Sequence, residues 1–272
     1  MLKDWGLTVD FGEHAFCKRD YLAGTDEERL ADFNAALRDP DIRAIFTTRG
    51  GKGSYRIADQ LDFAAARRDP KFVVGFSDIT ALHLSFLKHC HQIGIHGAFF
   101  AGPNEDTVSA ETNHSLRRVL MTTQDIVINS RLEEPTSHLT TSGSVTGRLI
   151  GGNLDMVATT AGWALPDLRG AILLLEAVNV YRGHVDRQLT MLRKAGRLNG
   201  LSGVAVGQFT GFEFDRNFSI IDILREHLDM LGVPVLGGLP LGHGNSPVSA
   251  LIGAVAELDA KAGTLTIKRS DT

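Results

Sequence analysis

Three residues that are far apart in the sequence have the chemical types of a hydrolytic triad. Ser77 lies in VVGFSDITALHL, where an apolar run meets a sharp Gly-X-Ser corner and then a helical pattern. Glu176 closes the apolar run ILLL, and His243 lies between glycines in GLPLGHGNSP. A serine hydroxyl can attack a carbonyl when a histidine takes its proton and a carboxylate orients that histidine. Taken singly, each has a simpler explanation: a helix cap, a strand end at the surface, and one loop histidine among ten.

The corner at Ser77 could also provide an oxyanion site. The first amides of a helix are unpaired and carry partial positive charge, so they can stabilise a developing negative charge. The segment is not a G-x-S-x-G elbow, because the residue two after Ser77 is Ile79. A capping hydroxyl and a nucleophile at the same helix start are compatible interpretations.

Two other segments are candidate binding sites. The loop TRGGKG, residues 48–53, could cradle an anion or present a backbone amide, and Arg49 could hold a carboxylate. It lacks the Lys-Ser/Thr ending of a phosphate loop, and a surface turn is the alternative. KHCHQIGIHG contains four possible metal ligands, His89, Cys90, His91 and His96. Neighbours on a helix point in different directions, and no H-E-x-x-H or paired C-x-x-C occurs, so a metal site is disfavoured.

Composition narrows the class of protein. The 272 residues suit one large domain or two small ones, and 43% apolar with 22% charged residues is typical of a globular protein. A net charge of -4 gives no basic footprint for nucleic acid, and no apolar run reaches the roughly 18 residues of a membrane span. The start lacks a secretory signal, and only Cys17 and Cys90 are present, so we expect a cytoplasmic protein.

The first hundred residues alternate strand-like and helical patterns. The strand-like runs are LTVDF, IRAIFTT and KFVVGF, and the helical stretches are TDEERLADFNAALRDP, YRIADQLDFAAARRDP and DITALHLSFLKHC. Thr25 and Glu28 form the sequence pattern of a capping box, and Pro40 ends that helix. This alternation predicts βαβ units and a parallel sheet. Ligands gather at the carboxyl ends of such strands, where the RGG loop and the Ser77 corner both lie.

The second half of the chain has a different pattern. Residues 102–143 are richer in Asn, Thr, Ser and Glu, and we interpret them as a crossover between domains. Strands then outnumber helices, and the strand ILLLEAV precedes a helix with three inward apolar residues, Val185, Leu189 and Leu192. We therefore expect an N-terminal α/β domain over residues 1–101 and a β-rich domain over residues 144–272.

Together these segments resemble the LD-carboxypeptidase family of serine peptidases, which includes the microcin-immunity peptidases. The matching pieces follow the family's order over nearly the whole chain: YLAGTDEERLADFNAALRDPDIRAIFTTRGGKGSYRI, GFSDITALHL, GRLIGGNLDMV, ILLLEAV, GVAVGQF and PLGHG. The resemblance implies an N-terminal parallel α/β layered domain and a C-terminal domain of swivelling β/β/α form. It implies Ser77 as the nucleophile, His243 as the base and Glu176 as its orienting acid, with neither metal nor cofactor.

The resemblance also implies a substrate and a mechanism. The substrate would be a muropeptide tetrapeptide stem, cut at the L-to-D bond to release D-alanine, by a cytoplasmic homodimer without nucleic-acid or membrane partners. Ser77 would attack the carbonyl, and the amides of Asp78 and Gly51, with Gly50 as the alternative to Gly51, would face the oxyanion. Arg49 or a helix terminus would bind the free carboxylate.

The chain departs from the family pattern at several points. Lys52 replaces a usual aromatic residue, and Ala177 replaces an acidic one. The family's first strand has no counterpart here, which predicts an exposed sheet edge and reduced stability. Two other functions stay open: cleavage of peptidyl- or aminoacyl-nucleotides, and a non-catalytic small-molecule binder. Residues 102–143 contain no Trp, Tyr or Phe, which disfavours base stacking.

Overall fold

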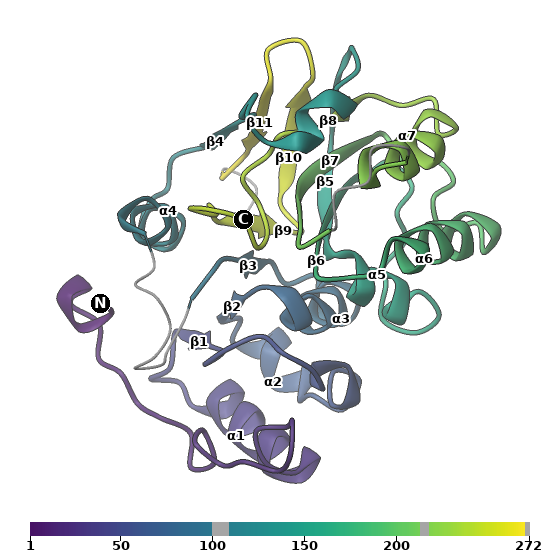
Figure 1. The fold of residues 1–272 in the computed structure, drawn as a ribbon. Coiled ribbons are helices and arrows are strands. Elements are labelled where there is room, and N and C mark those ends of the chain that lie inside the picture. The colour runs from purple at the N-terminus through teal and green to yellow at the C-terminus, as the bar shows by residue number, and fades with distance from the viewer. Residues whose placement is uncertain (100–108, 213–217, 270–272) are drawn as a thin grey trace.

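The computed structural model describes residues 1–99, 109–212 and 218–269 (Figure 1). Its strands form two sheets, one of four strands in the order β1-β2-β3-β9 and one of seven in the order β4-β11-β10-β5-β6-β7-β8. The four-stranded sheet lies with α1 to α3 in the lower half of Figure 1, and the seven-stranded sheet lies above it. The α/β fold class expected from the sequence is confirmed.

The smaller sheet has a parallel centre. β1 (Ala44–Phe46), β2 (Phe72–Gly75) and β3 (Gly94–His96) are parallel, as predicted. β9 (Ala250–Ile252) comes from the far end of the chain and pairs with β3 in the antiparallel direction. The last part of the sequence therefore completes the first sheet, while β1 forms its other edge within the described residues.

Helices and 3-10 turns accompany this sheet: η1 (Lys3–Trp5), α1 (Asp26–Arg38), η2 (Ser54–Arg56), α2 (Phe63–Arg68), η3 (Ser77–Ile79) and α3 (Thr80–Cys90). The capping box of α1 is confirmed, because Thr25 and Glu28 each accept a hydrogen bond from the other's backbone amide. Two expectations are wrong. LTVDF pairs with no strand in the described part, and the helical stretch after η2 is interrupted because Asp62 caps α2 separately.

The larger sheet is mixed. Its strands are β4 (Ile126–Asn129), β5 (Ser144–Asn153), β6 (Ile172–Val178), β7 (Gly203–Thr210), β8 (Val235–Leu236), β10 (Val255–Asp259) and β11 (Thr264–Ile267). β5 to β8 are parallel, whereas β10, β11 and β4 join in the antiparallel direction. The described part of residues 102–143 is not merely a linker, because it includes α4 (Ala110–Met121), β4 and η4 (Pro135–Leu139).

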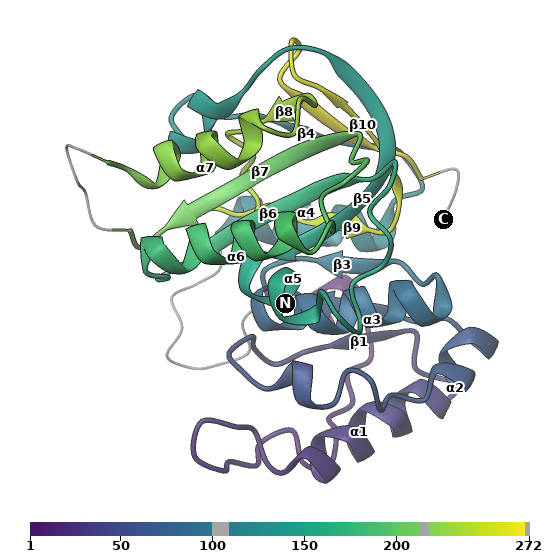
Figure 2. The ribbon, with the colours of Figure 1, turned by 90° about the vertical axis from the view of Figure 1, so that its right-hand side faces the viewer.

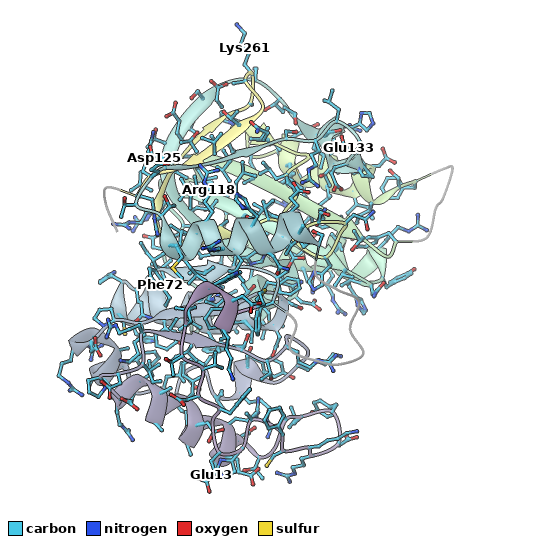
Figure 3. All side chains as sticks on the ribbon, turned by 90° about the vertical axis from the view of Figure 1, so that its left-hand side faces the viewer. Glu13, Phe72, Arg118, Asp125, Glu133 and Lys261 are labelled. Atoms are coloured by element: carbon cyan, nitrogen blue, oxygen red, sulfur yellow. The ribbon has the colours of Figure 1, made fainter. Side chains whose placement is uncertain are left out.

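Three helices cover one face of the parallel strands: α5 (Leu154–Thr160), α6 (Arg182–Lys194) and α7 (Ile220–Asp229). α6 and α7 cross in front of β6 and β7 in Figure 2, and the predicted inward residues of α6 are fully buried. α4 lies on the opposite face of the molecule, where Figure 3 labels its Arg118. None of the described helices is long and apolar enough to cross a membrane.

The two sheets share a hydrophobic core. One buried cluster joins Val74 and Ile95 of the small sheet to Leu149 and Leu174 of the large sheet, and all four side chains are fully excluded from solvent. α3 packs against α5 at the same junction. This shared packing sets the position of the Ser77 corner relative to the strand that carries Glu176.

Candidate active site

Ser77 lies in an uncommon backbone conformation directly after β2. Its φ is 62°, in the left-handed region that residues with a side chain rarely adopt. The N-cap of α3 is Ile79, which makes no side-chain capping bond, and no side chain caps η3. The Ser77 hydroxyl therefore does not act as a helix cap, and the simpler explanation of this serine is not supported.

Glu176 and His243 form a buried hydrogen-bonded pair. His243 Nδ1 lies 2.8 Å from Glu176 Oε2, two residues before the end of the largely buried β6. The Glu176 side chain is fully buried, while 18% of the His243 side chain is exposed. A carboxylate that engages Nδ1 leaves Nε2 as the nitrogen able to accept a proton. The pair thus has the arrangement of a base and its orienting acid.

The backbone beside His243 fits closely around this pair. Gly242 has a φ of 130°, and a Cβ on it would lie 2.9 Å from Glu176 Oε2. Only glycine combines this conformation with such a close approach. The first glycine of the GHG pattern is thereby explained by the space that the carboxylate needs.

Gln208, which the sequence did not single out, clamps the turn that carries His243. Gln208 is a fully buried residue of β7. Its Oε1 accepts a hydrogen bond from the Gly244 amide at 2.7 Å, and its Nε2 donates to Glu134 Oε1 at 2.7 Å. Thr210 Oγ1 contacts the His243 carbonyl at 3.5 Å. The oxygen of the carboxamide therefore holds the turn, while its nitrogen is anchored on Glu134. These contacts join segments that are distant in the sequence, so only the structure reveals them.

Phe76 brings the nucleophile corner next to the histidine. Its ring centroid lies 4.6 Å from that of His243, and it immediately precedes Ser77. Among the described residues, no hydrogen bond joins Ser77 to His243. The three candidate residues thus lie in one region of the structure, and the hydrogen bond between His243 and Glu176 is formed. Catalytic hydrogen bonds often tighten only when substrate is bound.

The loop predicted to face the oxyanion lies against Ser77. A Cβ on Gly50 would be 3.0 Å from Ser77 Cβ and 3.4 Å from its Oγ, whereas one on Gly51 would meet nothing within 4 Å. Gly50 is thus the glycine in direct contact with the serine side chain. Within the described residues, the amides of Gly50, Gly51 and Asp78 donate to no protein acceptor.

Asp78 holds that loop through its side chain. From the sequence, a role was expected only for its backbone amide. Its Oδ2 accepts the Ser54 amide at 2.8 Å, and the Ser54 hydroxyl donates to the Asp78 carbonyl. Burial raises the pKa of the Asp78 carboxyl, although the Ser54 hydrogen bonds lower it. The corner and the glycine loop are consequently fixed to each other.

Asn153 is a second polar residue that the sequence did not assign. It ends β5 directly opposite Glu176 in the strand register. Its backbone N–H donates to Thr80 Oγ1 at 3.1 Å, and this bond connects the large sheet to the start of α3. The sequence did contain a signal for this residue. Asn153 is a polar residue at the end of the GGN run, as Glu176 is at the end of ILLLE, and neighbouring parallel strands end at the same edge of a sheet.

The remaining predicted residues have separate surroundings. Arg49 is exposed and forms no ion pair with a described residue, and Lys52 is also exposed. His89 packs on Phe63, while His96 is buried behind the Ser77 corner. Among the described residues, no group of three or more His, Cys, Asp or Glu side chains could hold a metal ion.

Comparison with known proteins places this arrangement in a class. Residues 1–97 match the LD-carboxypeptidase N-terminal domain, and residues 146–258 match the LD-carboxypeptidase C-terminal domain. The chain therefore belongs to the LD-carboxypeptidase family of hydrolases. This finding confirms the family and the two-part architecture that the sequence segments indicated.

Individual relatives cover nearly the whole chain. A carboxypeptidase homologue of Streptomyces coelicolor is 36% identical over 99% of this chain and 86% of its own length. The murein tetrapeptide carboxypeptidase of Pseudomonas aeruginosa is 32% identical over 88% of this chain and 80% of its own.

Solved structures have the same fold. The muramoyltetrapeptide carboxypeptidase from Oxalobacter formigenes has a TM-score of 0.84 and 29% identity, covering 98% of this chain and 90% of that one. The microcin C7 self immunity protein in complex with aspartyl sulfamoyl adenosine has a TM-score of 0.86 and 26% identity, covering 98% and 88%.

Proposed function

We propose that this protein is a serine-type LD-carboxypeptidase that releases the terminal D-alanine from muropeptide tetrapeptide stems. The observation that carries the proposal is the 2.8 Å bond between His243 Nδ1 and the buried Glu176, beside a serine held at a φ of 62°. The family match and the names of the relatives support the same class of substrate.

The proposed reaction has two half-steps. His243 Nε2 takes the proton of the Ser77 hydroxyl while Oγ bonds to the carbonyl carbon of the penultimate residue. The carbon–nitrogen bond then breaks, and the D-alanine amine leaves with the proton from His243. A water repeats the sequence on the acyl-enzyme, giving its proton to His243 and releasing the tripeptide acid. Glu176 stabilises the imidazolium in both half-steps.

Negative charge on the tetrahedral intermediates needs donors. The amides of Asp78 and of Gly50 or Gly51 are proposed for this, because they flank Ser77 and have no acceptor among the described protein groups. Arg49 is proposed to bind the free carboxylate of the substrate. It is exposed, lies next to Gly50 in the sequence and has no described acidic partner.

An immunity-type peptidase acting on peptidyl- or aminoacyl-nucleotides is the second candidate. It is favoured by the similarity to the microcin C7 self immunity protein, which was solved with aspartyl sulfamoyl adenosine. The absence of Trp, Tyr and Phe from residues 102–143 of the sequence argues against a stacked base in that part of the chain.

The test is direct. The protein is incubated with a tetrapeptide stem and, separately, with an aminoacyl sulfamoyl nucleotide, and the products are followed by mass spectrometry. We expect D-alanine release, and loss of turnover in Ser77→Ala with substrate binding retained. Ser142→Ala, at an exposed position, is the matched control. Binding of the stem without turnover by the wild type would instead support a non-catalytic binder.

We also propose a cytoplasmic location and a homodimer. Two free cysteines, one exposed and one half-buried, are consistent with a reducing compartment. Cell fractionation and sedimentation of the purified protein test the two statements separately.

A further inference from the structure

A cleft of about 760 Å³ opens at the junction of the two sheets. Its lining side chains come from four segments, within residues 87–91, 148–150, 165–169 and 196–199. These segments belong to the end of α3, to β5, and to the loops that precede β6 and β7. The volume lies in the range of small-molecule sites, which is roughly 300–1,000 Å³.

The cleft is distinct from the candidate active site. α3 begins three residues after Ser77, whereas its other end contributes Lys88 to the cleft. Lys88 lies eight residues along α3 from Thr80, and this length of helix separates the two places by about 12 Å. The loop 165–169 likewise leads into β6, the strand that reaches Glu176 near its far end. Figure 2 shows α5 and α6 on the side of the molecule that faces the viewer.

Positive charge in the cleft is not balanced. Lys88, Arg148 and Arg197 line it and pair with no carboxylate in the described part of the chain. Each instead donates to main-chain carbonyls, which neutralise none of its charge. The lining contains one acid, Asp167, and that carboxylate is taken by Arg169. Three cations without an acidic partner among the described residues therefore line one cleft of a chain whose net charge is -4.

The cleft also contains an unused donor and an apolar wall. Arg197 Nε is buried and has no partner among the described groups, although the same guanidinium holds the Leu165 and Pro166 carbonyls. Leu87 and Ile150 form an apolar wall beside the cations, with 5% and 4% of each residue exposed. Guanidinium groups match the oxygens of phosphate, and the wall suits an apolar ring or chain.

We propose that this cleft binds a small organic phosphate, with the phosphate on Lys88, Arg148 and Arg197 and the apolar moiety on Leu87 and Ile150. The inference goes beyond the proposed function and does not depend on it, because it concerns binding at the end of α3 remote from Ser77.

The probe is 1-naphthyl phosphate, titrated by calorimetry into the full chain at about 0.15 M ionic strength, where long-range surface attraction is largely screened. Inorganic phosphate tests charge alone and 1-naphthol tests the apolar group alone. We expect saturable binding of naphthyl phosphate at least about tenfold tighter than either, a difference of about 1.4 kcal/mol.

Variants locate the site. Lys88→Gln and Arg148→Gln should each weaken binding about five- to tenfold, since each removes one phosphate contact. Arg117→Gln, at an exposed position of α4, is the charge-matched control and should bind as the wild type does. Ser77→Ala should also bind normally, which separates this result from the outcome of the activity test.

Three results would overturn the proposal. One is no saturable binding up to about 10 mM, a concentration beyond the weakest specific affinities. Another is equal binding of naphthol and naphthyl phosphate. The third is unchanged affinity in both cleft variants while they remain folded by circular dichroism, which would place the ligand elsewhere.

Discussion

Mild acid is expected to destabilise this protein through two buried histidines. His83 and His96 are 0% and 1% exposed, and they lie on α3 and at the end of β3, behind the Ser77 corner. Burial lowers the pKa of His83 to about 4, even though its Nε2 contacts the Val73 carbonyl at 3.1 Å. The pKa of His96 is lowered to about 3, mainly by burial and to a smaller extent by the charges of His83 and His243.

The direction follows from proton uptake by the unfolded chain. An imidazole in the unfolded state has a pKa of 6.5, so it takes up a proton below that pH, whereas the folded protein keeps both rings neutral. Above pH 6.5 the two histidines leave the free energy of unfolding unchanged. As pH falls from 6.5 towards 4, stability is progressively lost.

The magnitude can be worked from these pKa values. At pH 5, about 1.5 pH units below the unfolded value, each histidine costs about 2 kcal/mol, and the two together cost about 4 kcal/mol. A typical domain has only about 5–15 kcal/mol of stability, so this loss is large. Carboxylates titrate mainly below this window, since their ordinary pKa values are about 4.

The assay is urea denaturation at pH 7.5 and pH 5, compared between the wild type and His96→Met. The variant should lose about 2 kcal/mol less on acidification, since its unfolded chain takes up one proton fewer. His114→Gln, exposed on α4, is the control and should behave as the wild type. If His96→Met showed the full wild-type loss between the two pH values, the reasoning would be refuted.

Three substitutions test the candidate site itself. Glu176→Gln keeps the shape but removes the charge beside His243, and should lower kcat about 10²- to 10⁴-fold without loss of thermal stability; kcat within threefold of wild type would contradict this. Gly242→Ala places a methyl group 2.9 Å from the Glu176 carboxylate, and should lower stability by about 1–3 kcal/mol and reduce turnover. Its control is Gly232→Ala, where φ is also positive but space is open, and equal losses in thermal unfolding would dismiss the crowding argument. Gln208→Leu frees the His243 turn and should lower kcat about 10- to 100-fold with KM nearly unchanged. An effect on KM alone would show that Gln208 does not position the turn.

Local patterns were sufficient to predict the elements that carry the candidate residues. The capping box before α1, the β2 corner before α3 and the apolar run of β6 depend on neighbours in the sequence, and all three were predictable. The segments GFSD, ILLLE and PLGHG also kept the order of a known family, so Ser77, Glu176 and His243 could be named.

The supporting contacts were not predictable, because they join residues distant in the chain. Gln208 meets Gly244 across 36 positions, and Asp78 meets Ser54 across 24, with no local signal of either pairing. The pairing of β9 with β3 arises in the same way, since a three-residue strand needs a neighbouring edge to define it. Sequence patterns thus indicated the candidate residues but not the contacts that hold them in place.

The backbone of Ser77 distinguishes a strained corner from a helix cap within this one chain. Three other hydroxyl residues do cap helices: Thr25, Ser109 and Ser219 have φ values of -75°, -57° and -95°, and each accepts a hydrogen bond from the backbone amide at the third helical position. Ser77 instead has a φ of 62° and accepts no such amide. A left-handed residue with a side chain costs about 1–3 kcal/mol and persists only where its surroundings impose it. The bonds between Asp78 and Ser54 and the buried face of α3 supply that constraint. Capping therefore does not account for the corner, and we expect it to present the Ser77 hydroxyl beside the amides of Gly50, Gly51 and Asp78.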